Sequence, residues 1–221
     1  MSTGPRQLAL ALEHAENFAR DDFLSGTCNA AALALIDSWP QWANRSVVLT
    51  GPEGSGKSHL AAIWSEAAGA RLVAARALEQ VQVPAALATG ALVIEDVAAD
   101  TFDERALFHV LNLAREQDAF VLLTARMPPA HWRVAIRDLE SRLKALPIVS
   151  LAPPDDALLR AVLVKLFADR QIAVEQTLIS YVATRIERSF AAARTVVGML
   201  DIEAMRRKRA LTRALAAEIL R

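Results

Sequence analysis

The chain has 221 residues, enough for one α/β domain with an appendage or for two small domains, and its 53% apolar content excludes a disordered chain. Its 25 basic and 25 acidic residues balance, so net charge gives no whole-protein attraction to nucleic acid or to an anionic membrane. The single cysteine, Cys28, excludes a disulfide framework and a thiolate metal site.

The sequence shows no signal for a membrane span or for export. No apolar run approaches about 18 residues without a charge or a helix breaker, and the N-terminus lacks a basic segment followed by an apolar one. The histidines have no metal-ligand spacing; they are His14, His59, His109 and His131. We therefore expect a soluble protein in the reducing cytoplasm.

Apolar, partly β-branched runs alternate with helix-like segments through the first two-thirds of the chain, a pattern typical of a parallel sheet. The runs predict strands at Ser46–Thr50, Arg71–Ala74, Ala91–Ile94 and Ala119–Thr124, with a shorter fifth at Ile148–Leu151. The segments between them predict helices at Lys57–Ala68, Glu104–Gln117 and Ile136–Leu146. We expect these helices to cover both faces of the sheet.

The pattern changes at Pro153-Pro154-Asp155-Asp156, where prolines end one element and an aspartate can cap the next helix. After it the sequence predicts helices at Ala157–Arg170, Gln176–Arg185, Ala191–Arg206 and Thr212–Leu220. We therefore expect an N-terminal peptide and linker at 1–20, a nucleotide-binding α/β domain at 21–152 and a small all-helical domain at 153–221.

A phosphate loop lies between the first strand and the first helix. The sequence Gly51-Pro52-Glu53-Gly54-Ser55-Gly56-Lys57-Ser58 matches GxxxxGK[ST] in full. Glycines let backbone N–H groups turn toward one anion, Lys57 reaches the β- and γ-phosphates, and the Ser58 hydroxyl can bind Mg²⁺. The helix that follows adds the positive end of its dipole. This context favours nucleotide binding over a simple turn, and we include His59 among the nucleotide-binding residues.

A second nucleotide motif ends the strand at Leu92-Val93-Ile94-Glu95-Asp96. Two carboxylates there can hold the Mg²⁺ shell and polarise an attacking water. Their order is unusual, because Glu95 places a carboxylate one methylene further out where an aspartate is common. We therefore expect weak intrinsic hydrolysis; an acidic strand end that points to solvent is the alternative. Thr124, at the end of the next strand, can contact the γ-phosphate or the water.

Together these features resemble the AAA+ ATPases, and among them the DnaA-related family with its short Hda-type members. The likeness extends over almost the whole chain and includes Asp22-Phe23-Leu24-Ser25-Gly26 with Asn29, Thr124-Ala125-Arg126, Asp138-Leu139-Glu140-Ser141-Arg142-Leu143 and Leu151-Ala152-Pro153-Pro154. In that family these segments are, in order, an adenine-contacting lead-in, a sensor-type turn, an arginine-finger segment and the start of a helical lid. The resemblance implies an AAA+ domain with a five-stranded parallel sheet, a helical lid, ADP or ATP with Mg²⁺, and Arg142 as the finger.

The resemblance also bears on DNA. DnaA continues into a helix-turn-helix domain, and we expect no such domain after the last predicted helix of this sequence. The only strongly basic run is Arg206-Arg207-Lys208-Arg209, and cations near a helix C-terminus are ordinary partners of the helix dipole. We therefore expect DNA contact to be weak or to occur only through a partner.

Near the N-terminus, Gln7-Leu8-Ala9-Leu10-Ala11-Leu12 resembles the QLxLxL peptide that docks Hda-type proteins on the sliding clamp of DNA polymerase. An extended peptide places its three leucines on one side, and its glutamine can satisfy polar groups at a pocket rim. The same residues also suit a helix start. Alanines replace the family's usual polar residue and proline. The clamp-binding candidates are Gln7, Leu8, Leu10 and Leu12.

The family's lid arginine is not at its expected place. Ala191 occupies that position, and Arg194 lies one turn further along the same helix face. Arg194 is therefore our candidate for the lid contact with nucleotide. If neither residue reaches the phosphates, lid closure depends less on the γ-phosphate, which would suit a protein that works with ADP bound.

The resemblance implies a regulator that binds adenine nucleotide and the clamp, and that presents Arg142 to ATP held by DnaA, preventing re-initiation of replication. DnaA and the clamp are then its partners, with a homodimer left open. A helicase loader or remodeller that hydrolyses its own ATP is the main alternative. An enzyme that transfers phosphate to a small metabolite would need substrate-binding groups and an arginine-bearing lid over the phosphates. The arginine-finger segment and the helical tail make it the least favoured of the three.

Overall fold

The computed structural model describes residues 18–99 and 101–220. The clamp-binding peptide predicted at Gln7–Leu12 lies outside these described residues. Two compact units share the chain: an α/β unit at Phe18–Asp155 and a helical unit that begins at Asp156. Each unit has a hydrophobic core of its own. Within the described residues, no helix is long and apolar enough to cross a membrane.

A five-stranded parallel sheet forms the centre of the α/β unit, in the order β2-β3-β4-β1-β5. The strands are β1 (Ser46–Thr50), β2 (Arg71–Ala74), β3 (Ala91–Val97), β4 (Phe120–Ala125) and β5 (Ile148–Ser150). All five residues of β1 are buried, because this strand lies between β4 and β5. The predicted α/β fold with a five-stranded parallel sheet is confirmed.

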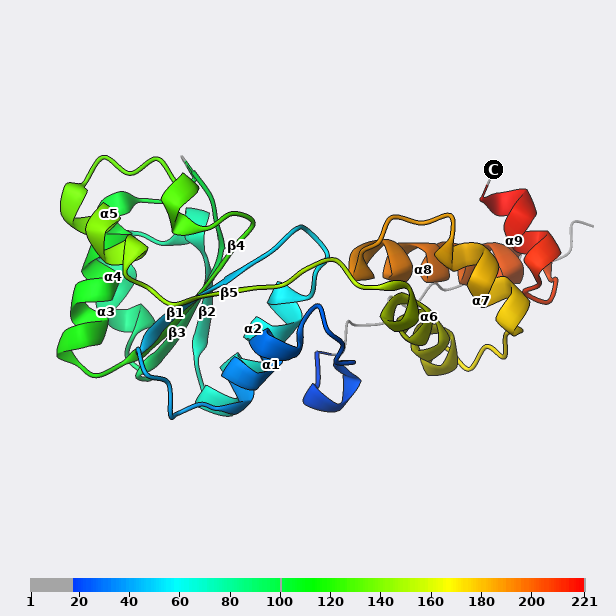
Figure 1. Ribbon diagram of the computed structural model, residues 1–221, viewed down its shortest axis with the longest axis horizontal. Helices are drawn as coiled ribbons and strands as arrows, with labels where there is room; N and C mark the ends of the chain where they lie inside the picture. Colours follow the sequence, from blue (N-terminus) through cyan, green and yellow to red (C-terminus); the bar gives the residue numbers. More distant parts are fainter. Residues whose placement is uncertain (1–17, 100, 221) are drawn as a thin grey trace, which may run out of the picture. The chain divides into compact units, whose positions relative to one another are not determined.

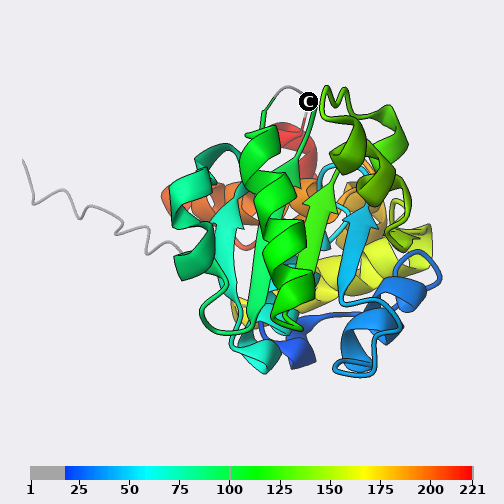
Figure 2. The same ribbon diagram turned by 90° about the vertical axis from the view of Figure 1, so that its left-hand side faces the viewer.

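Helices cover both faces of this sheet, as Figures 1 and 2 show. On one face lie α3 (Val83–Ala86), α4 (Glu104–Glu116) and α5 (Arg137–Lys144), and on the other lie α1 (Ala30–Asp37) and α2 (Lys57–Ala68). Strand residues alternate between the two cores: Val48 packs with the α4 face, and its neighbours Val47 and Leu49 pack with the α2 face. This two-sided burial explains why the strands are almost continuously apolar.

The helical unit contains α6 (Asp156–Asp169), α7 (Gln176–Ala183), α8 (Phe190–Arg207) and α9 (Arg213–Ile219). Its core includes Leu163 and Phe167 of α6 and Leu200 of α8. Ser189 caps α8 by accepting a hydrogen bond from the Ala192 N–H, and Thr212 caps α9 through the Leu215 N–H. No strand occurs among residues 156–220.

Several element boundaries differ from the sequence predictions. The strand expected to end at Ile94 continues to Val97, so Glu95 and Asp96 lie within β3. Helix α5 is shorter than the predicted segment, and α1 and α3 were not predicted. The described chain also has short 3-10 helices at Arg20–Asp22, Ala75–Ala77, Gln80–Gln82 and Pro129–His131.

Candidate functional site

The phosphate loop begins where β1 ends, and Gly51 starts it. The Gly51 N–H donates to the Ala125 carbonyl at 3.2 Å, which joins the loop to the end of β4. A Cβ at position 51 would lie 2.5 Å from the Leu151 carbonyl oxygen and 2.9 Å from Ser55 Oγ. Because a backbone oxygen cannot move aside, only glycine fits here.

The turn into α2 presents a group of unpaired backbone donors. Gly56 is the N-cap of α2 and has a φ of 98°, a left-handed conformation that favours glycine. Ser55 donates its N–H to the Pro52 carbonyl, but four other N–H groups have no acceptor within the described residues: those of Gly54, Gly56, Lys57 and Ser58. Unpaired N–H groups at a helix N-terminus form an anion site.

Lys57 is folded back onto this loop. Its Nζ donates to the Gly51 carbonyl at 2.9 Å and to the Pro52 carbonyl at 2.8 Å, and the residue is only 6% exposed. Burial lowers the pKa of Lys57, and three carboxylates oppose that shift: Asp96, Glu53 and Glu95. An anionic phosphate would be a stronger partner for the ammonium than two neutral carbonyls.

The end of β3 carries the acidic pair beside β4. Asp96 has a φ of 56°, and the register between β3 and β4 shifts between Ile94 and Val97. The Asp96 N–H donates to Thr124 Oγ1 at 3.1 Å, so the fully buried Thr124 joins the two strand ends. Its hydroxyl hydrogen is still able to donate to a ligand.

The two carboxylates of this pair have different surroundings. Glu95 is half-buried, and its buried Oε1 has no hydrogen-bond partner in residues 18–99 and 101–220, whereas Asp96 is exposed. A buried carboxylate oxygen without a donor suits a cation or a positioned water. The predicted Mg²⁺ ligands, Ser58, Glu95 and Asp96, all offer oxygen atoms, the ligand type that Mg²⁺ prefers, and their role stays a prediction. Within the described residues, no cluster of three or more His, Cys, Asp or Glu side chains could hold a metal.

An ion pair that was not predicted from the sequence joins the phosphate loop to the end of β4. Arg126 Nη2, after β4, lies 2.6 Å from Glu53 Oε2 in the loop, and both side chains are mostly exposed. The Arg126 guanidinium is close enough to help lower the Lys57 pKa, after the larger effect of burial. No local pattern predicts this pair, because it joins residues far apart in sequence.

The segment before α1 is fixed by Asn29, which is 1% exposed. Its Oδ1 accepts from the Gly26 N–H at 2.8 Å, and its Nδ2 donates to the Leu24 carbonyl at 3.1 Å. His59, one turn into α2, contacts this segment: its ring meets Phe18 and Phe23 edge-on, with centroids 5.2 and 5.1 Å apart. Asn29 and His59 thus hold the segment that the resemblance assigns to adenine contact.

Arg142 lies on α5 and has a half-buried side chain. Its Cζ is 5.2 Å from the centroid of the Phe108 ring on α4, a cation–π contact. Glu104, also on α4, accepts hydrogen bonds from backbone N–H groups at the start of α5. Sequence reasoning missed Glu104 and Phe108, since neither belongs to a motif.

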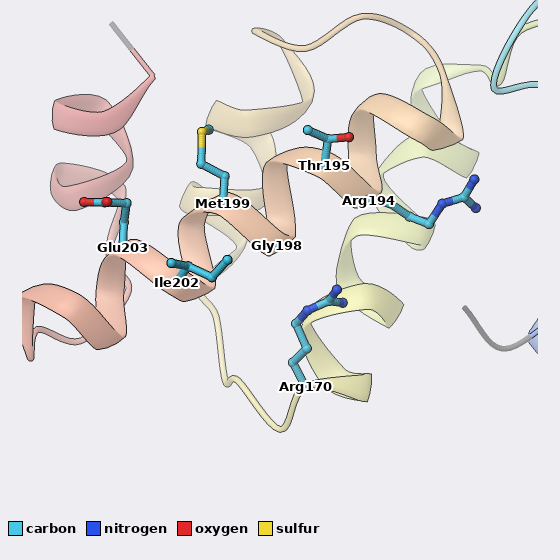
Figure 3. Close-up of a pocket in the computed structure, with 7 residues that line it drawn as sticks. All are labelled: Arg170, Arg194, Thr195, Gly198, Met199, Ile202 and Glu203. Carbon is cyan, nitrogen blue, oxygen red and sulfur yellow. The ribbon is translucent and has the colours of Figure 1, made fainter. Parts of the chain in front are cut away.

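Arg194 belongs to the helical unit, where it lines an open pocket of about 560 Å³. Figure 3 shows the pocket along α8, with Arg170 at the end of α6 beside it. The remaining lining residues are Thr195, Gly198, Met199, Ile202 and Glu203. The contact of Arg194 with nucleotide stays a prediction.

A buried parallel strand, a glycine-rich loop of free N–H donors and a helix define a P-loop unit, here followed by a helical unit. No family model matches the sequence, and no curated protein does. Solved structures of other proteins share the fold of this chain. Domain III of the replication initiation protein DnaA from Thermotoga maritima has a TM-score of 0.74 at 16% identity, covering 92% of this chain and 95% of that one.

Two further solved structures show the same fold. DnaA from Aquifex aeolicus bound to AMPPCP has a TM-score of 0.69 at 16% identity, covering 86% of this chain and 68% of that one. The RuvB Holliday junction branch migration motor of Thermotoga maritima has a TM-score of 0.70 at 17% identity, covering 91% of this chain and 70% of that one. These likenesses show that this chain shares the fold of DnaA and RuvB.

Proposed function

We propose that this chain is an Hda-like regulator of chromosomal replication initiation. It binds ADP or ATP in the phosphate loop and attaches to the sliding clamp through Gln7–Leu12. It then promotes hydrolysis of the ATP bound to DnaA. Its own ATPase activity is weak, and it acts in the cytoplasm.

The phosphate loop carries the nucleotide part of this proposal. At the positive end of α2, four backbone N–H groups have no acceptor among the described residues, and the Lys57 ammonium lies against the same loop. The likeness in fold to AMPPCP-bound DnaA supports a nucleotide as the anion. Ser58, Glu95 and Asp96 would hold Mg²⁺, which neutralises phosphate charge when bound. Identification of the nucleotide released from denatured protein tests nucleotide binding. The control is Lys57→Ala, which is expected to release none.

The proposed action on DnaA-bound ATP rests on Arg142. Among the described residues its guanidinium makes no hydrogen bond or ion pair, so its N–H donors are available for a phosphate on another protein. An arginine supplied to a neighbouring nucleotide stabilises the charge that develops on the transferred phosphoryl group. The sequence resemblance at Asp138–Leu143 supports the same role.

Hydrolysis of DnaA-bound ATP, followed with clamp-loaded DNA present, tests this role. We expect Arg142→Ala to reduce the stimulated rate on the order of 10³-fold, as for arginine fingers in GTPases. Arg137→Ala is the matched control, since it removes an exposed arginine from the same helix. Equal stimulation by wild type and Arg142→Ala would rule out the finger.

A second candidate is a helicase loader or remodeller that hydrolyses its own ATP. The buried Oε1 of Glu95, which has no hydrogen-bond partner among the residues described, favours it, because such a carboxylate oxygen can orient an attacking water. Steady ATP turnover by the purified protein, lost in Lys57→Ala, would support this candidate over the regulator.

A further inference from the structure

Arg142 is held in place by a contact that uses none of its hydrogen-bond donors, and these donors have no acceptor in the part of the chain that the structure describes. Its guanidinium lies over the Phe108 ring, and a cation–π contact leaves the N–H groups in the guanidinium plane free to donate. Glu140, an acid on the same helix, forms an ion pair with Lys144: its Oε1 lies 2.6 Å from Lys144 Nζ. Arg142 therefore keeps both its charge and its donors for another molecule.

A second contact fixes the start of the helix that carries Arg142. The Glu104 carboxylate accepts from the Ala135 N–H at 2.9 and 3.0 Å and from the Ile136 N–H at 2.9 Å. Ile136 is the N-cap of α5, and backbone donors at a helix start lack partners within the helix. The negative carboxylate also lies favourably at the positive end of the α5 dipole.

Both contacts come from α4. Glu104 and Phe108 are four residues apart, so they lie on one face of α4, one turn after another. The start of α4 is itself capped by Asp103, whose Oδ1 accepts from the Arg105 and Ala106 N–H groups at 2.8 and 3.1 Å. On the inner face of α5, Leu139 and Leu143 are buried in the core. The helix is thus restrained at its start, along its core face and beside Arg142.

We infer that Glu104 and Phe108 are positioning residues: they hold α5 and its arginine in the orientation that completes the nucleotide site of a partner. The inference rests on the proposed action of Arg142 on DnaA-bound ATP. Charge stabilisation in a transition state depends on donors placed at hydrogen-bond distance, and a misplacement of about 1 Å can cost about 10²-fold in rate.

The test measures DnaA-bound ATP hydrolysis on clamp-loaded DNA against the concentration of full-length variants. We expect Glu104→Ala to lower the maximal rate about tenfold and Phe108→Leu to lower it about threefold, with the half-maximal concentration unchanged. Phe108→Tyr keeps the ring and is expected to retain the wild-type rate. Glu116→Gln and Phe102→Leu are matched controls: Glu116 is exposed at the end of α4, and the Phe102 ring contacts Trp132.

The outcomes separate this inference from the function on which it rests. If Arg142→Ala lowers the rate but Glu104→Ala and Phe108→Leu do not, the positioning role is wrong and the finger remains. If Arg142→Ala has no effect, both are wrong. If the two α4 variants raise the half-maximal concentration or lose thermal stability while keeping the maximal rate, their role is structural, and the inference is also overturned.

Discussion

At the scale of single residues, Gly51 shows how tightly the phosphate loop is built. An alanine Cβ there would press on the Leu151 carbonyl at 2.5 Å, and the residue has a φ of 154°. We expect Gly51→Ala to lower the free energy of unfolding by about 3 kcal/mol, since neither backbone segment can yield without distorting β1 or β5. Urea denaturation followed by circular dichroism measures this loss.

Gly198 provides the opposite case for the same substitution. It lies inside α8, and an added Cβ there meets nothing within 4 Å. Alanine favours a helix interior over glycine by about 1 kcal/mol, so Gly198→Ala is expected to stabilise the helical unit. A loss of stability in both variants would show that steric contact at Gly51 is not the cause.

At the scale of elements, the basic run at the end of α8 proves to be paired. Glu203 Oε2 lies 3.0 Å from Arg206 and 3.1 Å from Arg207, and Glu218 of α9 lies 3.0 Å from Arg207 and 2.9 Å from Arg209. Three of the four cations in this run thus contact an acid, which weakens their attraction for phosphate. Weak contact of this chain with DNA stays a prediction.

Removing one of these acids should therefore leave more positive charge in the basic run available to DNA phosphates. We expect Glu218→Gln to tighten binding of non-specific duplex DNA about threefold at low salt and to steepen its salt dependence, because Arg209 loses its acidic partner and Arg207 keeps only Glu203. Fluorescence anisotropy at two salt concentrations measures both effects. Glu187→Gln changes the net charge equally at an exposed residue, and an equal gain in that variant would contradict the explanation.

Strong local patterns in the sequence identified most elements. The limits of β1, β2 and α2 match the predictions, because apolar runs or helical spacing and the phosphate-loop glycines define them. Helix α1 was missed, since its first residues, Ala30–Ile36, are continuously apolar and lack helical periodicity, and α3 has only four residues. The loop could be predicted as an anion site. The register shift at Asp96 and the Glu53–Arg126 ion pair could not be predicted, because each depends on a contact between residues far apart in the sequence.

At the scale of the whole molecule, the two units have separate cores, and only the α/β unit contains the phosphate loop. Chains with separate cores commonly unfold in more than one step. We therefore expect two calorimetric transitions for the full chain. A ligand raises the stability of the unit that binds it by about 2.7 kcal/mol at a concentration of 100 Kd.

For a unit of this size, that gain corresponds to a rise in Tm of roughly 8 °C. We expect ADP to raise only the transition of the α/β unit, and Lys57→Ala to abolish the rise, because the ammonium is then missing from the anion site. Calorimetry with and without ADP measures both transitions in one sample. A rise of equal size in both would mean that the helical unit also binds the nucleotide, which would be the first support for Arg194 as a nucleotide contact.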